Sequence, residues 1–478
     1  MTRRMHMSSN LKKNQLSYVE AMAISVAIMA PTAAMALNTS LTASIAGSAV
    51  PLTFLLAMIT IGLVSVTFIQ FNRFYSDSGS VYKFTGVSLG PKLGFLSGWV
   101  LFLTYFVFTV ASLAEVGAFM ESFFKYLGVS VSWVPIAFIS CLLIWALAFF
   151  DIKVGTRALL ILEGISILFI LILVGVIFKN AHLNGYSAGT PFTLGKTGIS
   201  SVALASVFAF LSFAGFEGAS SLGEETKNPK RAIPIAIFSA VFLTGIFYVL
   251  VSYAQTLGFG LDIKGIKTFS GSGAPLGDLA SKFMSSGYAA VIMFGASLSA
   301  FSCALASATA GARMLFSMGR DGFIHEKIGT THSKYGSPIV ALSVVMALSL
   351  LLLIPLIGLS GANVFGYLGT IGVIALLIAY LVTTFGGIVF FVRKGLWKGP
   401  ILILPILALA ALLYTLYSNI FPMPAAPYNY FPYIVLGWIL IGIVITLASP
   451  KLVSRIAKRL IEEGAEEEVP SKTKNKGA

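Results

Sequence analysis

The chain has 478 residues, of which 57% are hydrophobic and only 10% are charged. Soluble globular proteins carry about 25% charged residues, so a water-exposed surface over most of this chain is excluded. The net charge of +14 does not require a nucleic-acid partner, because basic residues gather in the cytoplasmic loops of membrane proteins. We therefore expect an integral membrane protein that contacts lipid and binds no nucleic acid.

Apolar runs long enough to cross a bilayer, about 20 residues each, follow one another along almost the whole chain. They predict an all-α integral membrane fold of about twelve transmembrane helices in one domain. The expected spans are 19–45, 50–71, 93–124, 132–150, 157–178, 198–222, 232–258, 288–318, 337–358, 364–392, 400–420 and 431–449. Residues 1–18 form a polar, basic segment in which we expect no removable signal peptide.

The distribution of Lys and Arg predicts the orientation in the membrane. If residues 1–18 are cytoplasmic, all but six of the 32 Lys and Arg residues fall on the cytoplasmic side. The six on the other side are Lys125, Lys179, Lys196, Lys264, Lys267 and Lys282. The positive-inside rule therefore predicts a plasma-membrane protein with both termini in the cytoplasm and an even number of spans. We expect residues 450–478 to form a cytoplasmic amphipathic helix and a disordered tail.

Two of the expected spans contain residues that interrupt a helix. Pro31 lacks a backbone N–H and clashes with the preceding turn, so the first span is expected to break near Met29–Ala34. In the sixth span, Gly215 and Gly218 flank a Phe-Glu pair and weaken the helix there. Each feature alone is also typical of an ordinary kink or a packing glycine. Interrupted helices at corresponding positions of two five-helix halves, however, indicate a transporter binding site.

Three carboxylates lie in the interior of expected spans, away from the span ends, where burying a charge costs at least about 2.5–3.5 kcal/mol. Glu217 lies at the break in the sixth span and is the strongest candidate for a functional group. Glu163 is also explained by pairing with a neighbouring helix, and Glu115 by reaching the outer membrane interface. These alternatives stay open for both residues.

Enzyme chemistry is not indicated by any motif in the sequence. The four histidines lie outside the expected spans: His6, His182, His325 and His332. Neither a zinc-protease HExxH motif nor a Walker A loop occurs, and the Gly-x-Ser-x-Gly patterns at residues 86–90 and 185–189 lie in loops between expected spans, where no strand-to-helix elbow is expected. Cys141 and Cys303 lie in apolar runs and predict no disulfide. We expect no metal site, no cofactor and no enzymatic activity.

The chain resembles the amino acid–polyamine–organocation superfamily of secondary transporters, and among them the amino acid permeases. The likeness is carried by residues 71–105, 213–237 and 311–322. The middle stretch holds Gly-Phe-Glu, Glu-Glu-Thr and Asn-Pro-Lys-Arg-Ala-Ile-Pro at the spacing of that family. The resemblance implies a five-plus-five inverted repeat with discontinuous helices 1 and 6, and alternating access in ion-coupled symport or exchange. The implied parts are repeat one at about 19–178, repeat two at about 198–392 and two extra helices at 400–449.

The resemblance places an amino acid or related amine between the two breaks. By position, the amides of Thr32, Ala33 and Ala34 and the Thr32 hydroxyl would bind a carboxylate at a helix N-terminus. The carbonyls of Phe213 and Ala214 would receive the amine. The implied substrate-binding residues are Met29, Ala30, Thr32, Ala33, Ala34, Thr109, Ser112, Phe210, Phe213, Ala214 and Phe216, with Phe210 or Phe216 as an aromatic gate.

The chain departs from the family pattern at two places. Where members often carry Gly-Ser-Gly, the first break has Ala30-Pro31-Thr32, so one carboxylate-binding N–H is lost. Where some proton-coupled relatives carry a lysine in helix 5, this chain has Ser166. The coupling ion therefore stays open between protons on Glu217 or Glu163 and sodium near Ser299 and Ser302. The candidate coupling and gating residues are Glu217, Glu163, Glu115, Ser166, Ser299 and Ser302.

Two other functions compete with amino acid transport. A polyamine or amine carrier needs acidic residues around its pocket, and only Glu115 and Glu217 are placed for that role. The many Ala, Phe, Ser and Thr residues of the pocket segments favour a small or apolar neutral substrate instead. A substrate sensor that does not transport is the more remote alternative, because such proteins usually carry an added signalling domain.

Overall fold

The computed structural model describes residues 16–75, 80–149, 153–181, 183, 185–194, 198–223, 226–332, 337–448 and 450. Most of the tail at 1–18 and of the segment at 450–478 lies outside these residues. Within the described residues the fold is helical throughout, and its one isolated β-bridge pairs Leu16 with Thr226.

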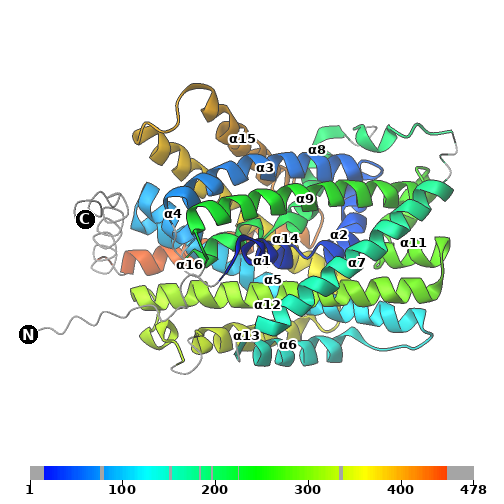
Figure 1. Ribbon diagram of the computed structural model, residues 1–478, viewed down its shortest axis with the longest axis horizontal. Coiled ribbons are helices and arrows are strands. Elements are labelled where there is room, and N and C mark those ends of the chain that lie inside the picture. Colours follow the sequence, from blue (N-terminus) through cyan, green and yellow to red (C-terminus); the bar gives the residue numbers. More distant parts are fainter. Residues whose placement is uncertain are drawn as a thin grey trace, which may run out of the picture.

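The helices alternate between long rods and short connecting segments (Figure 1). The first part of the chain forms α1 (Tyr18–Met29), α2 (Pro31–Ala46), α3 (Val50–Phe74), α4 (Ser80–Leu89), α5 (Pro91–Tyr126), α6 (Trp133–Phe149) and α7 (Lys153–Asn180). The middle part forms α8 (Gly198–Phe213), the 3-10 helix η2 (Phe216–Leu222), α9 (Pro229–Phe259), α10 (Ile263–Ser270), α11 (Pro275–Phe283) and α12 (Ser286–Asp321). The last part forms α13 (Ile339–Leu353), α14 (Gly361–Arg393), α15 (Ile403–Ser418) and α16 (Phe431–Ala448).

Eleven helical segments of the described chain are long and apolar enough to cross a membrane. Two of them contain a break: α1 with α2 spans Tyr18–Ala46, and α8 with η2 spans Gly198–Leu222. The expected span at 132–150 corresponds to α6, whose apolar part, Trp133–Ala148, is shorter than the others. The structure therefore confirms an all-helical protein of the membrane-spanning class.

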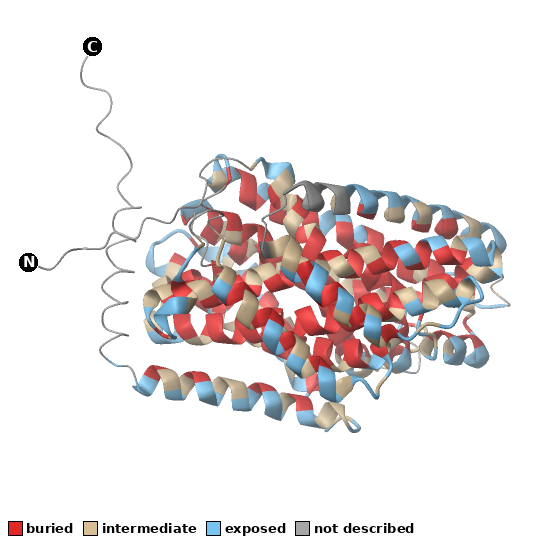
Figure 2. Ribbon diagram, turned by 90° about the horizontal axis from the view of Figure 1, so that it is seen from below, coloured by how far each residue is buried: buried red, intermediate tan, exposed pale blue. Residues whose placement is uncertain are grey.

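The bundle is built around α5 and α12, which are 36 residues long each and pack against one another. Buried residues gather in the middle of the bundle and exposed ones on the outer helices (Figure 2). On α16, Tyr433, Val444 and Leu447 are each at least 60% exposed. An apolar face of this kind would be an aggregation hazard in water, and it suits contact with lipid chains.

The first span breaks at Ala30, as the sequence predicts for the segment Met29–Ala34. Ala30 has a left-handed conformation with φ 43° and ψ 66°, and Pro31 is the first residue of α2. Proline is well suited to this position, because its fixed φ fits a helix start and its missing N–H would have no partner inside the helix. The residue before proline is driven out of the right-handed helical region, which explains why the break lies at Ala30.

The sixth span breaks at Gly215, whose φ of 97° favours glycine. A Cβ atom at Gly215 would overlap the side chain of Ile28 on α1. Next to this contact, the Ser25 hydroxyl donates to the Phe216 carbonyl at 2.8 Å and accepts from the Ala219 amide at 3.0 Å. The two breaks therefore lie side by side, and α1 is attached to η2.

Candidate functional site

A small cavity lies directly at the first break, between α1, α2, α5, α8, α12 and α14. Its lining residues are Ile28, Met29, Ala30, Ala33, Ala34, Asn38, Phe108, Ala111, Ser112, Glu115, Leu211, Ala214, Cys303 and Phe365. The cavity volume is about 20 Å³, which is room for one or two water molecules. A ligand larger than a few water molecules therefore requires the surrounding helices to move apart.

Six of the residues implied by the family resemblance line the cavity: Met29, Ala30, Ala33, Ala34, Ser112 and Ala214. The other five do not. Thr32 is fully buried, and Phe210 is 2% exposed. Thr109 is turned back to its own helix, where its hydroxyl donates to the Tyr105 carbonyl at 2.8 Å.

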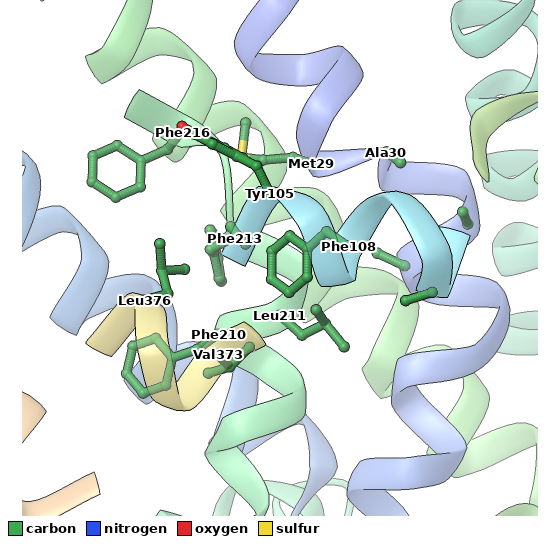
Figure 3. Packing of buried hydrophobic residues seen from close by; sticks show 14 of the residues in the cluster. Met29, Ala30, Tyr105, Phe108, Phe210, Leu211, Phe213, Phe216, Val373 and Leu376 are labelled. Atoms are coloured by element: carbon green, nitrogen blue, oxygen red, sulfur yellow. The ribbon is translucent and has the colours of Figure 1, made fainter. Parts of the chain in front are cut away.

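The two remaining aromatic residues pack behind the breaks. The ring of Phe213 lies edge-on to Tyr248, with 5.0 Å between centroids. Phe216 packs against Phe68 and Tyr380, each at 5.3 Å between centroids. Phe108 of α5, labelled near Leu211 in Figure 3, lines the cavity together with Ala30 and Leu211.

Sequence reasoning missed several lining residues, including Phe108, Leu211, Asn38 and Phe365. Helical spacing carries a signal for two of them. Phe108 lies four residues before Ser112, and Asn38 lies four residues after Ala34, so each shares a helix face with a predicted site residue. Phe365 of α14 is separated from the breaks by more than a hundred residues, and only the tertiary structure brings it to the cavity.

The start of α2 is capped by side chains from two distant helices. The Thr32 amide donates to Glu163 Oε1 of α7 at 2.8 Å, and the Ala33 amide donates to Ser299 Oγ of α12 at 3.2 Å. The Ala34 amide is engaged within the chain as well, with the Ala30 carbonyl at 2.9 Å. The amides that the resemblance assigns to a substrate carboxylate therefore have partners in this structure. Glu163 is 7% exposed, and the helix dipole at the start of α2 favours its charged form.

Glu217 is held at the start of η2 by phenol groups. Tyr105 of α5 donates to its Oε1 at 2.9 Å, and Tyr380 of α14 donates to its Oε2 at 2.6 Å. The Gly215 amide also faces this carboxylate. Glu217 is 1% exposed and does not line the cavity, so it connects the broken span to two continuous helices.

The carbonyl groups at the breaks are bridged by α9. The Tyr248 hydroxyl contacts both the Met29 carbonyl, at 3.2 Å, and the Ser212 carbonyl, at 2.8 Å. The Cys303 thiol of α12 lies 3.0 Å from the Ile28 carbonyl. The C-terminal ends of α1 and α8 are therefore held together behind the cavity.

Two polar side chains in the cavity wall carry an oxygen without a hydrogen-bond partner in the described part of the chain. Glu115 is 2% exposed, and its Oε1 is buried without a partner. Asn38 is 1% exposed and donates through Nδ2 to Ser212 Oγ at 2.8 Å, which leaves its Oδ1 without a partner. The cavity lining contains no Lys, Arg or His. The wall thus offers hydrogen-bond acceptors rather than positive charges.

The three serines predicted near a coupling ion lie in different places. Ser299 is buried at the α2 start, and Ser302 is buried further along α12. Ser166 of α7 donates to the Leu162 carbonyl at 2.9 Å and packs against Gly295 of α12. Glu163, one turn earlier on α7, is the residue that reaches the first break.

Comparison with known proteins agrees with this arrangement. The model of the family described as amino acid permease matches residues 20–452. The chain belongs to the amino acid permease family. The match confirms the resemblance, and it places the chain among permeases and not among enzymes.

Three relatives show the range of the family. The chain is 26% identical to the branched-chain amino acid permease BcaP of Bacillus subtilis, over 62% of this chain and 65% of the relative. It is 28% identical to a methylthioribose transporter of the same organism, over 61% of this chain and 64% of the relative. It is 24% identical to the low-affinity putrescine importer PlaP of Escherichia coli K12, over 63% of this chain and 66% of the relative. The chain thus matches slightly less than two thirds of the length of these relatives.

Proposed function

We propose that this permease is a secondary active transporter that moves amino acids or related amines across the membrane by alternating access. One observation carries the proposal: two broken spans meet at one cavity, which is lined by Ala30 at the first break and Ala214 at the second. Irregular backbone at membrane depth persists where it lines a cavity. The names of the relatives, which include an amino acid permease and a putrescine importer, support this substrate range.

The proposed architecture has twelve spans, with α6 counted as the fourth. Repeat one covers about residues 19–178, repeat two about 198–392, and α15 and α16 are the extra pair at 400–449. The broken helices are then the first member of each repeat, the positions at which such transporters bind their substrate. Residues 1–18 and 450–478 are cytoplasmic in this proposal, and the membrane is the plasma membrane.

Alternating access in this proposal is a movement of α1 and η2 as one unit. The Ser25 hydroxyl binds backbone groups of η2, and Ile28 fills the space beside Gly215. Because these contacts join the two segments, opening one of them displaces the other. The bonds from Tyr105 and Tyr380 to Glu217 hold this unit against α5 and α14, and they must break or rearrange when the cavity opens.

A proton is the first candidate for the coupling ion, and its carrier is Glu217 or Glu163. Each carboxylate is buried at the start of a half-helix, where its charge is favoured by the backbone. Protonation removes that charge and weakens the bonds that hold the half-helix, so it links proton binding to movement. Sodium near Ser299 and Ser302 is the alternative.

Uptake into proteoliposomes that contain the purified chain tests the proposal. Amino acids, putrescine and related amines are offered under an imposed pH gradient, an imposed sodium gradient or neither. Accumulation that follows the pH gradient supports proton coupling, and accumulation that needs sodium supports the alternative. Binding of a compound without any uptake or exchange would indicate a sensor and contradict the transport proposal.

A further inference from the structure

We propose that the substrate of this permease is a cationic amine without a carboxylate group, and that its ammonium binds Glu115 and Asn38. The inference rests on the proposed transport function and narrows its substrate class. It depends on two observations: an anion-binding helix end that is already occupied, and two buried acceptors in the cavity wall that have no donor.

The occupied helix end is the start of α2. Pro31 has no N–H, Thr32 donates to Glu163, and Ala33 donates to Ser299. A substrate carboxylate therefore finds no backbone donor at this end unless it displaces the side chains. It would also approach the charge of Glu163, and two carboxylates at one site repel each other strongly in a low-dielectric interior.

The acceptors lie in the cavity wall. Glu115 Oε1 and Asn38 Oδ1 are buried, and neither has a hydrogen-bond partner in the described residues. An unpaired buried carboxylate is costly, and the lining supplies no Lys, Arg or His to pair with it. A primary ammonium group brings a positive charge and three N–H donors, which is what these two oxygens lack.

The rest of the wall suits the apolar part of such an amine. Ala33, Ala111, Leu211 and Phe108 line the cavity with carbon atoms. Moving methylene groups from water to such a surface lowers the free energy. Aromatic rings such as Phe108 also attract a nearby cation through their faces. A positively charged head on a short hydrocarbon chain therefore matches both parts of the cavity.

Matched pairs of ligands test the inference with the purified full chain. Each amine is compared with its parent amino acid: putrescine with ornithine, cadaverine with lysine, and agmatine with arginine. Thermal-shift titrations give an affinity for each ligand, because a ligand that binds the folded protein raises its melting temperature. We expect each amine to bind at least about tenfold more tightly than its parent.

Two variants test the roles of Glu115 and of the Glu163 charge beside α2. Glu115→Gln keeps the size of the side chain and removes its charge, so it is expected to lower amine affinity by about 10- to 100-fold. Glu121→Gln on the same helix is the control, because Glu121 is exposed and is not among the cavity-lining residues. Glu163→Gln removes the charge at α2 and is expected to reduce the difference in binding affinity between each amine and its parent amino acid.

The outcomes separate the inference from the proposed function. If the parent amino acids bind as tightly as the amines, or if Glu115→Gln leaves amine affinity unchanged, the inference is overturned and the transport proposal stands. If neither class binds or is taken up, the proposed function itself fails. The comparison within each pair uses the wild-type chain, so it decides the question even if Glu115→Gln does not fold.

Discussion

The two broken spans hold their carboxylates in different ways. At α2 the carboxylate belongs to Glu163, 131 residues further along the chain, and a backbone amide binds it. At η2 the carboxylate is Glu217 of the broken segment itself, and two phenol groups from other helices bind it. A charge held by a helix end can be replaced by another anion, whereas a charge held by Tyr105 and Tyr380 joins three helices. The first break is thus suited to exchange of partners and the second to mechanical connection.

The largest loss of stability and of uptake is expected from a substitution where the second break contacts the first. Gly215→Ala places a side chain at φ 97° and against Ile28, so it adds backbone strain to overpacking. We expect the free energy of unfolding to fall by about 2–4 kcal/mol, together with loss of uptake. The melting temperature in detergent and uptake into proteoliposomes measure the two effects. The control is Gly62→Ala on α3, where a Cβ meets no atom within 4 Å and the helix gains propensity.

The next largest effect is expected from Glu217→Gln. The amide keeps one acceptor but loses the charge that strengthens both phenol hydrogen bonds. We therefore expect the free energy of unfolding to fall by about 1–3 kcal/mol. Tyr380→Phe removes one of the two donors and should give a smaller loss. If both variants melt like the wild type, the carboxylate does not connect η2 to α5 and α14.

Glu163→Gln is expected to be milder for stability. Its Oε1 accepts one backbone amide, and a neutral amide oxygen still accepts it, so the loss of charge at the helix start costs about 0.3–1 kcal/mol. Its effect on proton coupling should be larger than its effect on stability if Glu163 is the carrier. Uptake driven by a pH gradient measures that coupling. Equal gradient-driven accumulation in Glu163→Gln and wild type would assign the proton to another group.

Much of this arrangement follows from the sequence, because it depends on local chemistry. Hydrophobic runs predicted the spans, and Pro31 predicted the first break to within a few residues. The partners of the breaks did not follow, because a side chain such as Glu163 or Tyr248 reaches them only through the packing of distant helices. The family resemblance pointed to Ser166 as the residue aligned with a lysine of some relatives, whereas Glu163 reaches α2 from one turn earlier. The rotation of α7 about its own axis decides which side chain reaches α2, and a single sequence does not determine that rotation.

An equally small effect on stability is expected from Pro31→Ala, which returns an N–H to the first position of α2. The break should remain at Ala30, because Tyr248 and Ile28 hold the end of α1, and the greater freedom of the unfolded chain should cost about 0.4–1 kcal/mol. The informative measurement is the affinity for a matched amine and amino acid. If the substrate carboxylate binds at α2, the new donor should strengthen amino acid binding alone, by a net hydrogen-bond contribution of about 0.5–1.5 kcal/mol. If the substrate has no carboxylate, both affinities should stay unchanged. Pro31→Ala therefore distinguishes an α2 terminus that binds the substrate from one that serves only Glu163.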